Sequence, residues 1–287
     1  MVFAALALAG CVVAPVNVER AAAVPVVAPV PASVPAGMQY LYGSGEGAAI
    51  SMQAWQGLVA YVAQAARVRP RESVVLAGDA TLAAPRFVPC GAKPLAAVFD
   101  VDETVLLNLG FEADEAAHPG RTYDAARWER WERTGTAAVA PVPGARAALD
   151  AIRRAGVTVV FNSNRTAATA SFTEAALTGA GLGPARHGET LFLKGDDATG
   201  SRKDGRRQQI AARYCVVAMG GDQLGDFSDL FNTDAAVPAR RAAVTAPAIA
   251  AKWGTGWFVM PNPVYGTALQ GTIDQVYPRD RRWSDAQ

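Results

Sequence analysis

The sequence predicts an α/β fold with a doubly wound, parallel, Rossmann-like sheet. Five short apolar runs, at residues 95–99, 157–161, 191–193, 215–219 and 256–260, are typical of strands buried on both faces. Helical patterns separate these runs, and strands that alternate with helices form parallel sheets. With 287 residues, 51% of them hydrophobic, the chain is long enough for one such domain with an accessory segment, or for two small domains.

A long amphipathic helix is predicted between residues 38 and 71. Its apolar side chains recur close to helical spacing at Ile50, Met52, Trp55, Leu58, Val59, Val62 and Ala66. Residues 72–94 have mixed character and contain Pro85, Pro89 and Pro94, so no element is predicted there.

The segments between the strands supply the remaining helices. Residues 144–154 and 166–180 are predicted helices, and a basic helix is expected to start near Ser201 with Lys203 in its first turn. Residues 105–140 contain several aromatic side chains and lack a regular period. We expect them to form a small, mostly helical cap over the strand ends.

The N-terminal segment predicts export and a lipid anchor. Residues 1–10 are apolar and lead into Cys11 through Leu-Ala-Gly, which resembles the lipobox of bacterial lipoproteins. The segment lacks the basic start of a signal peptide and is too short to span a bilayer. Residues 12–37 are rich in Val, Pro and Ala, as in an extended tether to a domain over 38–287. The expected location is the outer membrane, facing the periplasm or the cell surface, with the lipid as the sole membrane attachment.

Charge and cysteine content narrow the possible partners. The formal net charge of +1 argues against nucleic acid as a partner, because nucleic-acid binding normally requires a basic face. Cys90 and Cys215 fit no metal-binding spacing. In an exported protein they could form a disulfide, or Cys215 could be a buried thiol at the start of a strand.

Two aspartates follow directly after the first apolar run. Asp100 and Asp102 are one residue apart, so in extended chain their side chains point the same way. Ligands of open parallel sheets bind beyond the carboxyl ends of the strands. Two like charges this close are unfavourable unless a cation or a shared proton relieves them. The pair therefore predicts a functional site, with an ordinary acidic turn as the alternative.

The other strand ends carry complementary chemistry. Ser163 and Asn164 follow the second strand and could bind an oxyanion. Lys203 is a cation at a helix start, which the helix dipole disfavours, so a ligand could require it. Asp222 and Asp226 flank a glycine-containing turn after the fourth strand. Each of these has an ordinary explanation as a turn, cap or surface residue, but their order along successive strand ends indicates one site.

These residues resemble the motifs of the haloacid dehalogenase (HAD) superfamily, and within it the bacterial class C acid phosphatases, the lipoprotein e group. The resemblance extends from about Met38 to the region of Tyr277. Its motifs are found in the ranges 100–106, 163–165, 201–206 and 221–227, with further similarity at Trp128, Trp131, 143–145 and 260–266. The chain differs from the usual pattern at Leu107, Phe111, Gln223 and Gly225. These differences leave the catalytic set intact, so the resemblance does not define the substrate pocket.

The resemblance implies a phosphomonoester hydrolase that uses Mg²⁺. Asp100 would attack phosphorus and form an aspartyl-phosphate, while Asp102 would serve as general acid and base. The Asp100 carboxylate, the Asp102 carbonyl and Asp222 would bind the metal, with Asp226 supporting this shell.

Ser163, Asn164 and Lys203 would bind the phosphoryl oxygens. Lys194 is the alternative lysine, although it lacks the Ser-x-Lys-x-x-Arg setting of Lys203.

The same resemblance suggests the substrate class. Phe111, Trp128 and Tyr265 are candidates for stacking on a nucleobase or another apolar leaving group, which implies a small-molecule phosphomonoester such as a nucleoside monophosphate and a 5′-nucleotidase activity. Aromatic side chains are as readily explained as part of the core.

Three alternative functions compete with phosphomonoester hydrolysis. Residues 186–190 spell Arg-His-Gly-Glu-Thr, as in histidine phosphatases, but a loop precedes His187 and the only other histidine, His118, comes earlier. A non-catalytic, tethered lipoprotein that binds a phosphorylated ligand is a second alternative. Phosphotransfer to an alcohol, through the same aspartyl-phosphate, is the third.

Overall fold

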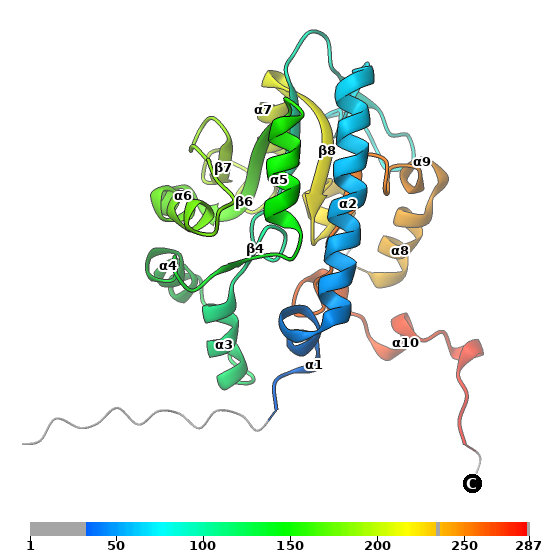
Figure 1. The fold of residues 1–287 in the computed structure, drawn as a ribbon. Helices are drawn as coiled ribbons and strands as arrows, with labels where there is room; N and C mark the ends of the chain where they lie inside the picture. The colour runs from blue at the N-terminus through cyan, green and yellow to red at the C-terminus, as the bar shows by residue number, and fades with distance from the viewer. Residues whose placement is uncertain (1–32, 234–235, 286–287) are drawn as a thin grey trace, which may run out of the picture. The chain divides into compact units, whose positions relative to one another are not determined.

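A five-stranded parallel sheet forms the centre of the fold in this computed structural model, as the sequence predicts (Figure 1). The strand order is β7-β6-β3-β8-β9, so the first strand of the sheet in sequence lies in the middle. The bounds are β3 Leu95–Phe99, β6 Thr158–Thr166, β7 Leu191–Lys194, β8 Cys215–Gly221 and β9 Trp257–Val259. This order places the carboxyl end of β3 between those of β6 and β8.

The structure describes residues 33–233 and 236–285. The described residues belong to a unit that spans residues 31–287. Cys11, the signal over 1–11 and residues 12–32 of the tether therefore lie outside the described residues. Helix α1 (Ala36–Met38) begins two residues before the predicted domain boundary.

Helices cover both faces of the sheet because its strands are apolar on both sides. On one face pack α2 (Gly45–Val68), α5 (Ala145–Arg154) and α6 (Ala170–Gly179), and α2 and α5 lie side by side in Figure 1. Phe99 of β3 points to this face and contacts Trp55 of α2, with ring centroids 5.2 Å apart.

The opposite face is covered by α7 (Asp204–Arg213) and by an antiparallel hairpin. The hairpin strands β1 (Glu72–Leu76) and β2 (Phe87–Pro89) lie in the segment for which no element was predicted. Trp257 of β9 donates from its indole nitrogen to the Val74 carbonyl at 2.8 Å, which fastens the hairpin to the sheet. Long-range packing of this kind has no periodic sequence signal.

The long N-terminal helix is preceded by a π-helical turn over Gln39–Gly43. Ser44 then caps α2, because its hydroxyl accepts from the Gly47 amide at 2.9 Å. The predicted helix over 38–71 therefore consists of this turn and of α2.

The segment predicted as a cap contains two helices between two short strands. Strands β4 (Leu106–Leu107) and β5 (Ala140–Pro141) pair with each other and enclose α3 (Leu109–Ala117) and α4 (Ala125–Thr134). Phe111 of α3 packs edge-on against Trp128 of α4, with centroids 4.9 Å apart.

The C-terminal part of the described chain contains three short helices. These are α8 (Val237–Thr245), α9 (Pro247–Ala250) and α10 (Ile273–Val276). Among the described helices, none is both long and apolar enough to cross a membrane.

A disulfide joins Cys90 to Cys215. It links the residue after β2 to the first residue of β8, so it ties the hairpin to the central sheet. Of the two alternatives that the sequence leaves open for these cysteines, the structure has the disulfide.

Candidate active site

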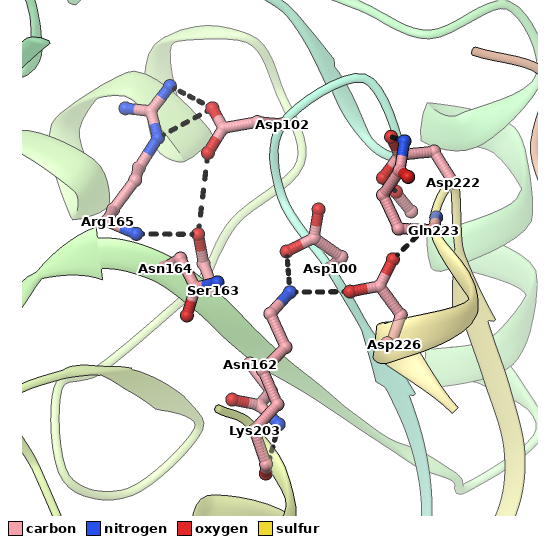
Figure 2. A network of polar contacts seen from close by, with 12 residues as sticks. Asp100, Asp102, Asn162, Ser163, Asn164, Arg165, Lys203, Asp222, Gln223 and Asp226 are labelled. Atoms are coloured by element: carbon pink, nitrogen blue, oxygen red, sulfur yellow. Dashed lines mark hydrogen bonds and ion pairs between the residues drawn. The ribbon is translucent and has the colours of Figure 1, made fainter. Parts of the chain in front are cut away.

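Asp100 lies at the carboxyl end of the middle strand, β3. Its amide donates to the Gly220 carbonyl of β8 at 3.0 Å, which continues the ladder between the two strands by one residue. Asp100 is 8% exposed, and its carboxylate points toward Lys203 (Figure 2). The pairing of β3 with β8 thus places the Asp100 side chain at the predicted site.

The chain turns sharply after Asp100. The amides of Val105 and Leu106 donate to the Val101 carbonyl at 3.0 and 2.9 Å. Glu103 has a backbone φ of 53°, a value that residues other than glycine rarely adopt. Its carboxylate accepts from the Asn108 amide at 2.9 Å and from the hydroxyls of Tyr42 and Tyr265. These bonds hold the turn in shape, and burial followed by the charge of Asp102 raises the pKa of Glu103 to about 8.

Asp102 is held by Arg165, which belongs to β6. Two guanidinium nitrogens, Nε and Nη2, donate to Asp102 Oδ1 at 2.9 and 2.7 Å. Asn108 Nδ2 donates to the same oxygen at 2.9 Å. Arg165 is 2% exposed, so this ion pair fixes the direction of the Asp102 side chain.

Lys203 lies at the start of α7, but not inside its first turn. The helix begins at Asp204, and Ser201 does not cap it. The cap comes from another segment, because the Asp229 carboxylate accepts from the amides of Lys203 and Asp204 at 2.9 and 2.7 Å. The prediction that Lys203 lies in the first turn of a helix starting near Ser201 was therefore wrong, because Lys203 directly precedes the helix. A carboxylate from outside the helix satisfies these amide donors and complements the helix dipole.

The Lys203 ammonium is buried between two carboxylates. It contacts Asp100 and lies 2.7 Å from Asp226 Oδ1 (Figure 2). Burial lowers the pKa of Lys203, but Asp100 and Asp226 raise it by more, so the net pKa lies above its usual value. The other candidate lysine, Lys194, is exposed.

Three carboxylates converge at the ends of β3 and β8. Oxygens of Asp100, Asp222 and Asp226 lie within 4.8 Å of one another. Burial raises the pKa of Asp100, and the nearby acids Asp226 and Asp222 raise it further against the effect of Lys203. Burial and then Asp226 raise the pKa of Asp222 to about 7. A divalent cation would relieve this repulsion, and an all-oxygen donor set suits a hard metal.

Neighbouring side chains orient Asp222. Thr104 Oγ1 donates to Asp222 Oδ1 at 3.1 Å. Asn262 Nδ2 and Gln223 Nε2 donate to Oδ2 at 2.7 and 3.0 Å. Asp226, in turn, accepts from the Gln223 amide at 2.9 Å, so the turn after β8 is closed by its own side chains.

Ser163 and Asn164 lie on the neighbouring strand, β6. The Ser163 hydroxyl is fully buried, accepts from the Arg165 amide at 3.1 Å and lies 3.5 Å from Asp102 Oδ2. Asn164 borders the open side of the site, and its side-chain oxygen accepts from Arg206 Nη2 at 2.7 Å. Both predicted residues are thus next to the Asp102 side of the site.

A cavity of about 610 Å³ opens over these groups. Asp100, Asp102, Lys203, Asp222 and Asp226 line its floor. Its walls include all three aromatic residues singled out from the sequence, which are Phe111, Trp128 and Tyr265, together with Tyr123. Phe111 is also packed on Trp128 and covered on one face by Arg127, so it serves both the cap's core and the cavity wall.

Sequence reasoning missed several residues that shape the site. Asp229 caps α7, Asn108 and Arg165 fix Asp102, and Asn262 orients Asp222. Arg165 and Asn262 lie within the motifs named above, but no local pattern gave their partners, which are 63 and 40 residues away.

His187, by contrast, is remote from these groups. It pairs with Asp196 and does not border the cavity.

A parallel α/β sheet whose middle strand ends in two aspartates, with a lysine and a second acid pair beside them, defines a phosphoryl-transfer site of the HAD type. The chain belongs to subfamily IIIB of the HAD superfamily, the acid phosphatases, whose family model matches residues 46–268. It is therefore a phosphomonoester hydrolase, as the sequence motifs predict.

Solved structures agree with this fold. A class C acid phosphatase from Bacillus anthracis with tungstate bound superposes with a TM-score of 0.65 at 24% identity, covering 87% of this chain and 90% of that one. A second structure of the class C acid phosphatase from the same organism gives 0.65 at 23% identity, with 88% and 96% covered. No curated protein matches the sequence.

Proposed function

We propose that this phosphatase is Mg²⁺-dependent, works through an aspartyl-phosphate on Asp100, and hydrolyses phosphomonoesters with a flat, apolar leaving group, including 5′-nucleotides. One observation supports this above the others. The Asp100 carboxylate is buried against the Lys203 ammonium at the floor of an aromatic-walled cavity.

The residues present fit a magnesium ion. Asp100 and Asp222 would bind it through carboxylate oxygens, the Asp102 carbonyl would be a further ligand, and Asp226 would support the shell. When bound, the ion supplies positive charge that offsets the repulsion between the attacking carboxylate and the phosphoryl group. Burial, and after it the charges of the neighbouring acids, raise the pKa values of Asp100 and Asp222, and such an ion would favour their ionised forms.

The chain's own side chains account for the rest of the proposed mechanism. Asp100 attacks phosphorus, and the bond to the leaving oxygen breaks. Asp102, held by Arg165, gives its proton to that oxygen and later takes one from the attacking water. Lys203 would offset negative charge on the phosphoryl oxygens, and Asn164, which lines the cavity, would be a donor to them. Ser163, buried next to Asp102, would be a further donor.

The aromatic walls support a planar leaving group. Tyr265 is 38% exposed and borders the cavity, as does the half-buried Trp128. A nucleobase between such side chains would gain stacking energy of about 1–3 kcal/mol. Hydrolysis and transfer to an alcohol share the same first half, so the acceptor in the second half distinguishes the two activities.

For its location, we propose an exported protein attached to the outer membrane through a lipid on Cys11. The Cys90–Cys215 disulfide supports export, because such bonds persist in oxidising compartments. Mass spectrometry of the mature N-terminus tests the proposal, with Cys11→Ala as the control. An unmodified Cys11 in membrane-free protein would contradict it.

The catalytic proposal is tested by release of phosphate from p-nitrophenyl phosphate and a panel of 5′-nucleotides. The assay compares Mg²⁺ with EDTA and wild type with Asp100→Asn. We expect release that requires both the metal and Asp100. Release that persists in EDTA would refute the metal dependence.

A second assay, with and without glycerol, identifies whether water or an alcohol accepts the phosphoryl group. A ratio of nitrophenol to phosphate that stays at one indicates hydrolysis. An excess of nitrophenol over phosphate identifies phosphotransfer.

A further inference from the structure

The cavity over the active site is strongly acidic. Among the described residues, seven carboxylate side chains line it: Asp100, Asp102, Glu112, Glu115, Asp222, Asp226 and Asp229. Lys203 is the cation among the lining residues. A phosphomonoester substrate is itself an anion and is repelled by these carboxylates. We therefore ask which protein group each carboxylate binds.

Six of the seven carboxylates bind groups of the protein itself. Asp100 and Asp226 hold Lys203, and Arg165 pairs with Asp102. Glu115 pairs with Arg127, Asp229 caps α7, and Asp222 accepts three side-chain hydrogen bonds.

Glu112 differs from the others. It is 6% exposed, yet within the described part of the chain its carboxylate has no hydrogen bond and no ion pair. It lies on α3, directly after Phe111 and in the cavity wall that also contains Trp128. Its carboxylate therefore faces the cavity without a protein donor and is open to a ligand that supplies one.

The surroundings of Glu112 favour a cation as that ligand. Burial and the charge of Glu115 raise its pKa to about 7, against the opposing effect of Arg127. Arg127 is itself paired with Asp114 and Glu115, so it compensates the charge of Glu112 only in part. Trp128 and Tyr265 line the same cavity. A carboxylate among aromatic rings is the usual environment that recognises an organic ammonium group.

We propose that Glu112 is a specificity-determining residue, which selects phosphomonoesters whose leaving group carries a cationic nitrogen. This inference rests on the proposed phosphatase activity of the same cavity and adds a substrate class to it. The cationic nitrogen would form an ion pair with the Glu112 carboxylate while the phosphoryl group lies at Asp100.

The test compares two substrates of nearly equal shape. Phosphocholine carries a trimethylammonium group, and 3,3-dimethylbutyl phosphate carries a neutral tert-butyl group in its place. A second pair with a six-carbon chain between phosphate and head group tests longer reach. The kcat/KM ratio of cationic to neutral substrate is measured for the wild type and for Glu112→Gln at pH 8, and differences in intrinsic leaving-group reactivity cancel between the enzymes.

We expect the ratio for at least one pair to fall about tenfold in Glu112→Gln, as for the loss of one charge-assisted contact. Glu129→Gln is the matched control, because the Glu129 side chain on α4 is 45% exposed, pairs with Arg133 and does not border the cavity. It should keep the wild-type ratio.

An unchanged ratio for both pairs in Glu112→Gln would overturn the inference, even with p-nitrophenyl phosphate hydrolysed normally. If the wild type does not hydrolyse p-nitrophenyl phosphate at all, the phosphatase proposal is refuted instead. If Glu112→Gln fails to fold, inhibition of the wild-type protein decides the matter. Choline should then inhibit p-nitrophenyl phosphate hydrolysis about tenfold more strongly than 3,3-dimethylbutanol, and equal inhibition would overturn the inference.

Discussion

Arg165 binds a single oxygen of Asp102. Its Nε and Nη2 atoms lie 2.9 and 2.7 Å from Oδ1. The other oxygen, Oδ2, has only the Ser163 hydroxyl within hydrogen-bond range among the described residues, at 3.5 Å. One oxygen of the proposed general acid is therefore fixed, and the other is left to carry the proton.

This geometry makes Arg165 a positioning residue for proton transfer. Arg165→Lys keeps the charge but loses the two-nitrogen contact, so Asp102 should be misdirected. We expect kcat to fall about 10²-fold with alkyl phosphates, whose leaving oxygen needs a proton, and much less with p-nitrophenyl phosphate. Rates across a series of leaving-group pKa values check this. An equal loss for all substrates would mean that Arg165 serves structure alone.

The nucleophile makes a sharper prediction. Asp100→Asn keeps the shape of the side chain but cannot form the acyl-phosphate, so turnover should fall by about 10⁴-fold or more. Mass spectrometry of acid-quenched wild-type protein should find a phosphoryl group on Asp100, and none in the variant. Retained turnover in Asp100→Asn would show that another residue attacks phosphorus.

Much of this site could be predicted because its residues directly follow the strands of the sheet in the sequence. Short apolar runs mark β3, β6 and β8, and the polar residues after each must meet at one edge of a parallel sheet. Asp100 and Lys203 are 103 residues apart, yet both follow from such local signals together with the family motifs.

The contacts that orient these residues had no such signal. The Asp229 cap on α7 and the Arg165 contact to Asp102 depend on where loops return in space. The β1–β2 hairpin was missed for a similar reason, because prolines interrupt its pattern and packing against Trp257 stabilises it.

Metal binding should be visible in stability, independently of activity. Mg²⁺ at about 100 times its dissociation constant should stabilise the protein by about 2.7 kcal/mol. For a chain of this size that raises the Tm by about 5–10 °C. Asp222→Asn should lose most of this increase because it removes a ligand. Calorimetry with and without Mg²⁺ measures the effect, and an equal increase in the variant would place the ion elsewhere.

The cation preference proposed for Glu112 should depend on pH. Its pKa is raised to about 7 by burial and then by Glu115, so the carboxylate is charged above that pH and neutral below it. The ratio of kcat/KM for cationic over neutral substrate should therefore be largest above pH 7 and should decrease as the pH falls through 7. The charged or titratable groups that face Glu112 are Glu115, Arg127, Asp102, Glu103 and Tyr42. Glu112→Gln should give a flat ratio, and a wild-type slope that persists in this variant would assign the titration to one of those neighbours.

The disulfide should contribute measurably to stability. Cys90 and Cys215 are 125 residues apart, and a bond that closes so long a loop restricts the unfolded chain strongly. The double variant Cys90→Ala/Cys215→Ala should lose about 2–4 kcal/mol in the free energy of unfolding. Urea denaturation of both proteins measures the loss, and the stability of wild type kept in dithiothreitol should move toward that of the variant.

Because the bond lies at the amino end of β8, away from Asp100 at the carboxyl edge, kcat should change little at temperatures where both proteins are folded. A large loss of kcat in folded protein would mean that the hairpin it fastens also controls the site.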